Sequence, residues 1–133
     1  MSNISEILAS ARTIAVVGLS EKRFRPSYGV AEYLKRAGYR IIPVNPGPCE
    51  VLGEKCLPSL DSIPGEVDIV DIFRRSEFVP EIVEAAIRKG VKAIWMQEGV
   101  YHPEAARRAE EAGIAVMMDR CLLKDHRRFA IAS

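Results

Sequence analysis

The sequence predicts an α/β fold in which a doubly wound parallel sheet of about five strands carries helices on both faces. Two observations predict it. Apolar runs without polar alternation recur along the chain, a pattern typical of strands that are buried on both faces. The runs start about 23 to 28 residues apart, a spacing that accommodates a strand, a crossover helix and two turns.

The expected strands share short length and β-branched or aromatic content, and they cover residues 13–17, 39–44, 67–73, 91–96 and 114–118. Right-handed crossovers between such strands give a mostly parallel sheet, for which we expect the strand order 3-2-1-4-5. Ligands bind these sheets beyond the carboxyl ends of the strands. We therefore expect the binding site near the switch point between the first and fourth strands.

Helices are expected in most of the connections. A short amphipathic helix over residues 3–11 opens the chain, and the helices that precede three of the strands end at Gly38, Gly90 and Gly113. The connection 45–66 contains too many prolines and glycines for a long helix. We expect it to be irregular, with about one helical turn near residues 59–62.

The totals exclude several classes of protein. The chain has 133 residues, 48% of them hydrophobic and 28% charged, which suits one domain over residues 1–133 with its own core. A formal charge of +1 supplies no field for nucleic acid or an anionic membrane. No apolar stretch approaches the roughly 20 residues that span a bilayer, and no signal-peptide pattern opens the chain. We expect a cytoplasmic protein.

The cysteines and histidines offer little for a metal centre. The three cysteines, Cys49, Cys56 and Cys121, are odd in number and form no C-x-x-C pattern, which argues against a disulfide framework and against structural zinc. Only two histidines are present. We therefore expect no metal site.

The first strand-to-helix turn carries the features of a phosphate site. Gly18 lets the backbone approach a ligand, and the Ser20 hydroxyl can donate to a phosphate oxygen. Three cations follow within four positions, at Lys22, Arg23 and Arg25, and the next helix starts near Pro26 or Ser27. Amide groups at a helix N-terminus attract phosphate. The alternative is a tight turn followed by a solvated basic loop.

The pattern of a nicotinamide dinucleotide site is not met. After Gly18 the next glycine is Gly29, so G-x-G-x-x-G is absent. Asn45 stands at the end of the second strand, where such sites place an acid on the ribose hydroxyls. The uncharged Val44, Asn45 and Pro46 leave room for an adenosine that carries an extra phosphate. The alternative for Asn45 and Pro46 is a simple turn.

Two further strand ends offer ligand contacts. Phe73, Arg74 and Arg75 follow the third strand, where an aromatic or guanidinium plane can stack on adenine and arginine can pair with phosphate. Gln97 and Gly99 follow the fourth strand and can contact the distal arm of the ligand. The alternative for the arginine pair is a solvated surface turn.

Several short motifs in one order resemble a known family. They are Ala15–Ser20, Pro43–Pro46 with Val51–Glu54, Val67–Asp71, Trp95–Gly99 and Met118–Cys121. In these segments the chain resembles stand-alone CoA-binding proteins related to the nucleotide-binding domain of the succinyl-CoA synthetase α subunit. The resemblance implies a Rossmann-like fold, with pyrophosphate near Gly18 to Ser20 and adenosine near Val44 to Pro46 and Phe73 to Arg75.

The resemblance does not extend to catalysis. The ligase relatives use a phosphorylated histidine and a nucleotide-activating partner domain, and we expect neither here. His102 and His126 lie outside any matching motif and are interpreted as surface residues. Cys121 follows the fifth strand beside Arg120, where cations favour thiolate. It can contact the CoA thiol or form a mixed disulfide with it; the alternative is a small buried residue.

These observations favour non-catalytic binding of coenzyme A or an acyl-CoA, and they leave open a protein partner or a homo-oligomer. A small enzyme that uses a nicotinamide cofactor, or CoA thiol chemistry through Cys121, is the alternative. The residues expected to contact the ligand are Gly18, Leu19, Ser20, Arg23, Arg25, Pro26, Ser27, Tyr28, Val44, Asn45, Pro46, Phe73, Arg74, Arg75, Gln97, Gly99 and Cys121.

Overall fold

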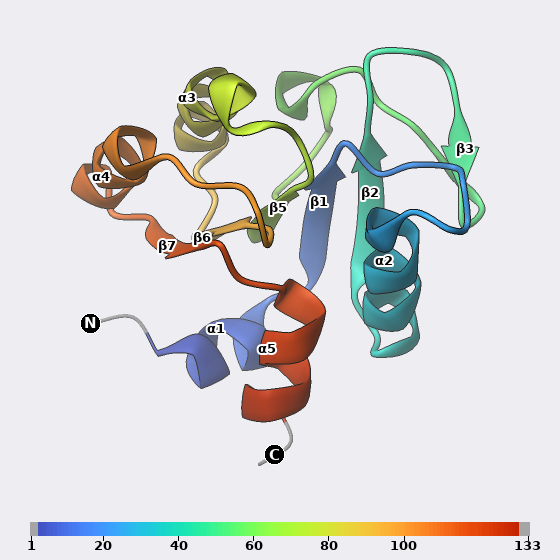
Figure 1. Cartoon of the computed structure of the whole chain (residues 1–133), viewed down its shortest axis with the longest axis horizontal. Coiled ribbons are helices and arrows are strands. Elements are labelled where there is room, and N and C mark those ends of the chain that lie inside the picture. Colours follow the sequence, from blue (N-terminus) through green and yellow to red (C-terminus); the bar gives the residue numbers. More distant parts are fainter. Residues whose placement is uncertain (1–2, 131–133) are drawn as a thin grey trace.

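A five-stranded parallel sheet forms the centre of the computed structural model, which describes residues 3–130 (Figure 1). Its strands are β1 (Thr13–Val17), β2 (Arg40–Val44), β5 (Ile69–Ile72), β6 (Ala93–Met96) and β7 (Ala115–Met118). Each lies within the run that the sequence identified. All four strand pairs are parallel. The predicted fold class, an α/β Rossmann-like doubly wound sheet, is confirmed.

The strand order differs from the expected one. The sheet runs β2-β1-β5-β6-β7, so in order of appearance it is 2-1-3-4-5 and not 3-2-1-4-5. Pro43 supplies a physical reason: its carbonyl accepts from the Leu57 amide on the side away from β1, and proline offers no N–H to a strand on that side. β2 is therefore the edge strand, and the switch point lies between β1 and β5.

Helices cover both faces of the sheet. α2 (Pro26–Arg36), α3 (Val79–Lys89) and α4 (Pro103–Glu111) are crossover helices, and each has proline at its first or second position, where no amide partner is lost. α3 ends at Gly90 in the left-handed conformation, with φ 74°, as the sequence predicted. α1 (Ile4–Ser10) is the expected N-terminal helix. α5 (Leu122–Phe129) was not expected.

The two faces have separate apolar layers. One gathers residues of α3 and α4, and the other gathers residues of α1, α2 and α5. Trp95 is fully buried in the second layer, and its indole Nε1 donates to Asp125 Oδ2 at 2.8 Å. Arg120 Nη2 donates to the other oxygen of that carboxylate at 2.7 Å. These bonds fix α5 against the sheet.

The irregular connection after β2 contains more structure than expected. The antiparallel strands β3 (Glu50–Val51) and β4 (Glu54–Lys55) form a hairpin, and the short 3₁₀ helix Leu60–Ser62 supplies the expected single turn. A second 3₁₀ helix, Ser76–Phe78, precedes α3. The hairpin brings Cys49 and Cys56 together in a disulfide, with 5.2 Å between their Cα atoms. The expectation of no disulfide is wrong, because strand pairing, rather than a local motif, aligns the two cysteines.

Asp71 is a charged residue type inside the sheet. It lies on β5 between Val16 and Trp95 of the neighbouring strands. Its side chain is 0% exposed, and neither carboxyl oxygen has a hydrogen-bond partner among the described residues. Desolvation by burial raises the pKa of Asp71 well above the ordinary value. Burial without a hydrogen-bond partner among the described residues therefore favours the neutral, protonated form of this carboxyl.

Replacing Asp71 by asparagine tests this burial. In the unfolded chain Asp71 ionises above about pH 3.9, whereas the folded chain keeps its proton, so this group lowers stability as pH rises. One proton corresponds to a slope of about 1.4 kcal/mol per pH unit until the folded pKa is reached. Urea unfolding measured from pH 4 upward should show that the free energy of unfolding of Asp71→Asn lacks this downward slope, which the wild type retains. Parallel curves for the two proteins would contradict a buried neutral acid.

Candidate functional site

The carboxyl ends of β1 and β5 form the switch point of the sheet. β1 leads to α2 on one face, and β5 leads to α3 on the other (Figure 1). A cleft of about 500 Å³ opens on the α2 side and one of about 300 Å³ on the α3 side. The sequence neighbours Gly18 and Val17 line different clefts, as do Phe73 and Arg74. The two clefts therefore adjoin at the tips of these strands, where such sheets bind ligands.

Gly18 lies where the two clefts adjoin, with its backbone close to that of Phe73. Its φ is +87°, and its N–H donates to the Val44 carbonyl at 2.9 Å. A Cβ at this position would lie 2.4 Å from the Phe73 carbonyl oxygen. Both the backbone angle and the close approach therefore require glycine.

The turn after Gly18 is ordered by two serines. Ser20 N–H donates to the Ser27 hydroxyl at 3.0 Å, and Lys22 N–H donates to the Ser20 hydroxyl at 3.0 Å. The Ser20 hydroxyl acts as acceptor in this bond, and no acceptor for its own proton lies among residues 3–130, so that proton can be donated to an anion. Ser27 is buried in the first turn of α2 and, with Pro26, lines the α2-side cleft. The positive end of that helix dipole faces the same cleft.

Cations near the turn lack acidic partners. Among residues 3–130, no carboxylate pairs with Lys22, Arg23, Arg25 or Arg74. Arg25 lines the α2-side cleft and Arg74 the α3-side cleft. Unpaired guanidinium groups beside the N-terminus of α2 favour a phosphate ligand.

The aromatic side chains nearby contact these arginines. The Arg23 guanidinium lies 5.9 Å from the centre of the Tyr28 ring. That of Arg74 lies 4.4 Å from the centre of the Phe78 ring. Arg75 is mostly exposed and contacts Glu77 at 3.8 Å. The two arginines that the sequence treated alike therefore differ, since Arg74 lines a cleft and Arg75 does not.

The α3-side cleft has an apolar floor and a polar rim. Val17, Val44 and Ile82 supply the floor. Asn45 and Pro46, which the sequence selected as ligand contacts, also line it. The sequence missed the rest of the wall, which comes from the 3₁₀ segment and from α3, namely Pro58, Ser59, Leu60, Asp61, Glu81, Ala85 and Arg88. The helical periodicity marked α3 only as a core helix and gave no signal that its edge borders a cleft.

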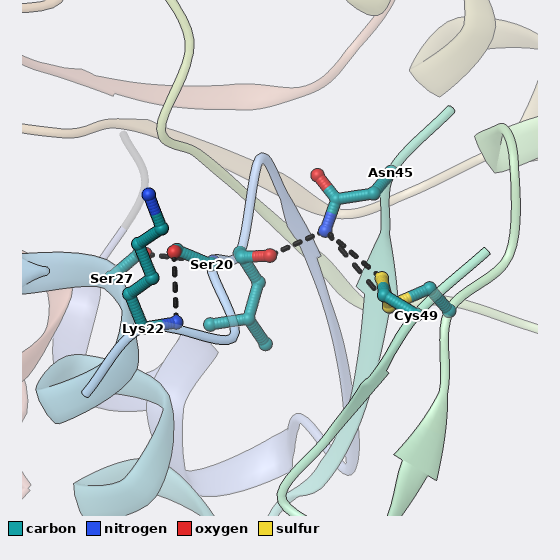
Figure 2. The surroundings of a disulfide bond; sticks show 7 residues. Ser20, Lys22, Ser27, Asn45 and Cys49 are labelled. Atoms are coloured by element: carbon teal, nitrogen blue, oxygen red, sulfur yellow. Dashed lines mark hydrogen bonds between the residues drawn. A yellow bond between two sulfur atoms is a disulfide. The ribbon is translucent and has the colours of Figure 1, made fainter. Parts of the chain in front are cut away.

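Asn45 connects this cleft with the turn. Its Nδ2 donates to the Leu19 carbonyl and lies 3.6 Å from Cys49 Sγ and 4.0 Å from Cys56 Sγ (Figure 2). Leu19 itself is fully buried and points away from the clefts into the core. Asn45 is therefore more than a turn residue, because its amide fixes the carbonyl between Gly18 and Ser20.

The ends of β6 and β7 complete the α2-side rim. Gln97 is buried and lines the cleft. Glu98, which the sequence did not select, also lines it, and its Oε2 accepts from Lys124 Nζ at 2.9 Å. Gly99 N–H donates to Asp119 Oδ1 at 2.7 Å and lies outside both clefts. Cys121 is 7% exposed, precedes α5 and also lies outside them.

The arrangement suits an elongated anionic ligand that crosses the switch point with its phosphates at Gly18 to Ser20. In the described part of the chain, no three His, Cys, Asp or Glu side chains are grouped to hold a metal ion. A search of residues 3–130 finds no helix with the length and apolar character needed to cross a membrane.

Comparison with known proteins adds independent information. A family model described as "CoA binding domain" matches residues 12–127. The uncharacterized protein YneT of Bacillus subtilis is 42% identical over 125 residues, which are 94% of this chain and 93% of that protein. A hypothetical protein from Pyrococcus horikoshii OT3 has a similar structure, with TM-score 0.91, 43% identity, and coverage of 95% of this chain and 89% of that one.

A larger enzyme contains a similar segment. The ADP-forming acetate–CoA ligase II of Archaeoglobus fulgidus is 33% identical over 101 residues. The match covers 74% of this chain and 15% of the ligase.

Replacing Gly18 by alanine tests the close approach at the switch point. The left-handed φ and the Phe73 carbonyl both oppose a Cβ, so we expect a loss of about 2 kcal/mol or more in the free energy of unfolding. Gly29→Ala is the matched control. Gly29 lies inside α2, and a Cβ added there would meet nothing within 4 Å. Alanine at this position is therefore expected to raise the free energy of unfolding by about 0.5–1 kcal/mol. Equal effects in chemical denaturation would refute the constraint at Gly18.

Proposed function

Since the chain belongs to the CoA-binding domain family, we propose that it binds coenzyme A or an acyl-CoA without transforming it. The observation that carries the proposal is the turn at the switch point. There, Gly18 brings the backbone close to the ligand position, the Ser20 proton is free, and Arg25 and Arg74 have no acidic partner among residues 3–130. CoA carries its pyrophosphate in the middle of an elongated molecule, which matches two clefts that adjoin at a phosphate turn.

We place the parts of CoA as follows. The pyrophosphate lies at Gly18 to Ser20, near the N-terminus of α2. The adenosine occupies the α3-side cleft against Val44 and Asn45, and Arg74 binds the 3′-phosphate. The pantetheine arm extends along the α2-side cleft toward Gln97.

In this proposal the protein holds CoA for sensing, storage or delivery to a protein partner or a second copy, in the cytoplasm. The segment of the ADP-forming acetate–CoA ligase that is similar to this chain is only 15% of that enzyme. A match to so small a part of the enzyme supports a role in holding CoA rather than in the ligase reaction. The competing proposal, an enzyme that acts through Cys121, needs a thiol in contact with the ligand. Cys121 is buried and lines neither cleft, which weighs against it.

A thermal-shift panel with CoA, acetyl-CoA, dephospho-CoA, NAD and NADP tests the proposal. A ligand at 100 times its dissociation constant adds about 2.7 kcal/mol of stability, which is measurable. We expect CoA and acetyl-CoA to stabilise most and dephospho-CoA less, because the latter lacks the 3′-phosphate. Stabilisation by NAD but not by CoA would overturn the proposal.

Arg74→Ala tests the placement of the 3′-phosphate. A charged hydrogen bond contributes roughly tenfold or more in affinity, so the wild type should prefer CoA over dephospho-CoA by about that factor, and Arg74→Ala should reduce the preference to about twofold. Arg36→Ala removes the same charge from the far end of α2, where Arg36 pairs with Glu32, and should leave the preference unchanged. Isothermal titration measures both. An unchanged preference in Arg74→Ala would move the 3′-phosphate elsewhere.

A further inference from the structure

The side chain of Asn45 lies between the Cys49–Cys56 disulfide and the Gly18 to Ser20 turn, which is called the phosphate turn below. Figure 2 shows the two sulfur atoms beside the Asn45 amide, which on its other side meets the Leu19 carbonyl. An amide nitrogen has two protons, so Asn45 can serve the sulfur pair and the turn at the same time. The disulfide therefore contributes two of the contacts that position the Asn45 amide.

The disulfide is accessible at one end. Cys56 is buried, whereas Cys49 is partly exposed and follows the exposed segment Pro46 to Pro48. A thiolate must reach a sulfur atom along the S–S axis for exchange. We therefore expect a reductant to attack Cys49 Sγ before Cys56 Sγ.

The hairpin does not depend on the disulfide alone. Lys35 of α2 donates to the Leu52 carbonyl and pairs with Glu54 at 3.3 Å. Leu57 N–H donates to the Pro43 carbonyl at 3.0 Å, and its own carbonyl accepts from Asn45 N–H at 2.9 Å. These bonds keep the hairpin and the Asn45 backbone in place when the S–S bond breaks. The effect of reduction should therefore be local to the Asn45 side chain.

We propose that Cys49–Cys56 is a reversible redox site that sets the affinity of the phosphate turn, an inference that rests on the proposed function. A thiolate of a dithiol attacks Cys49 Sγ, forms a mixed disulfide and releases Cys56 as a thiolate, which takes up a proton. The second thiol of the reductant then displaces Cys49. The protein pair gains two electrons and two protons, and the dithiol becomes a disulfide.

Reduction weakens ligand binding in this account. Two thiols cannot remain at bonding distance, so the sulfur pair separates and each gains an S–H, a weak donor. The Asn45 amide loses its fixed neighbours and holds the Leu19 carbonyl less firmly. The Leu19–Ser20 peptide, whose N–H donates to Ser27, is then less well ordered, and so is the Ser20 hydroxyl that we expect to bind phosphate.

The test uses desulfo-CoA, which lacks the thiol and cannot exchange with the disulfide. Titration of the full chain before and after treatment with dithiothreitol should show about fivefold weaker binding after reduction, the effect of roughly one hydrogen bond. Alkylation in denaturant should count one free thiol before reduction and three after it, from the three cysteines of the chain. Affinities within twofold of each other, or three free thiols after oxidation, would overturn the inference.

Two variants separate the effect that the disulfide exerts through Asn45, here called the relay, from other effects of thiols. The double variant Cys49→Ser with Cys56→Ser retains Cys121, and we expect it to bind as the reduced protein does and to ignore dithiothreitol. Asn45→Ala should bind more weakly and lose most of the redox response, as a double-mutant cycle requires. A redox response that persists in either variant would refute the relay through Asn45.

Amide hydrogen exchange distinguishes failure of this inference from failure of the proposed function. If desulfo-CoA binds neither redox form, the CoA proposal fails. The redox site is then judged on the free protein alone, where reduction should speed exchange at the Ser20 and Lys22 amides. Equal exchange rates in the two forms would overturn it.

Discussion

The contact on which the rest of the site depends is the approach of the Gly18 backbone to the Phe73 carbonyl, where a Cβ would lie at 2.4 Å. It joins the tips of β1 and β5, the two strands from which the chain leaves to opposite faces. Because no side chain intervenes, the two clefts adjoin there, and the Ser20 and Ser27 hydroxyls can order the turn beside them. A ligand with central phosphates and two arms fits that geometry.

The second determinant is the irregular segment after β2. It forms one wall of the α3-side cleft, and through the Asn45 amide it also positions the Leu19 carbonyl of the turn. A regular crossover helix would cover the sheet without reaching the turn in this way. The prolines and glycines that break the helical pattern thus serve the site, because they allow a hairpin, a disulfide and a polar strand end to gather at one edge.

The strands and the turn could be predicted from the sequence because local patterns encode them: apolar runs, glycine stops and the Gly18 to Ser20 segment. The strand order could not, since it depends on pairing between distant segments. Pro43 was the available clue, as it disfavours an inner strand. The disulfide was missed because the hairpin that aligns its cysteines has no motif. α5 was missed because its polar, charged sequence shows no flanking glycine or proline, and because Asp125 anchors it partly through the distant Trp95.

The central claim is that the switch point receives the phosphates of CoA. A crystal structure of the chain grown with CoA tests it most directly. We expect the pyrophosphate within hydrogen-bond distance of the Gly18 to Ser20 turn, with the adenosine in the cleft beside Val44 and Arg74. A turn left empty at saturating CoA, or CoA bound at a different edge of the sheet, would contradict it.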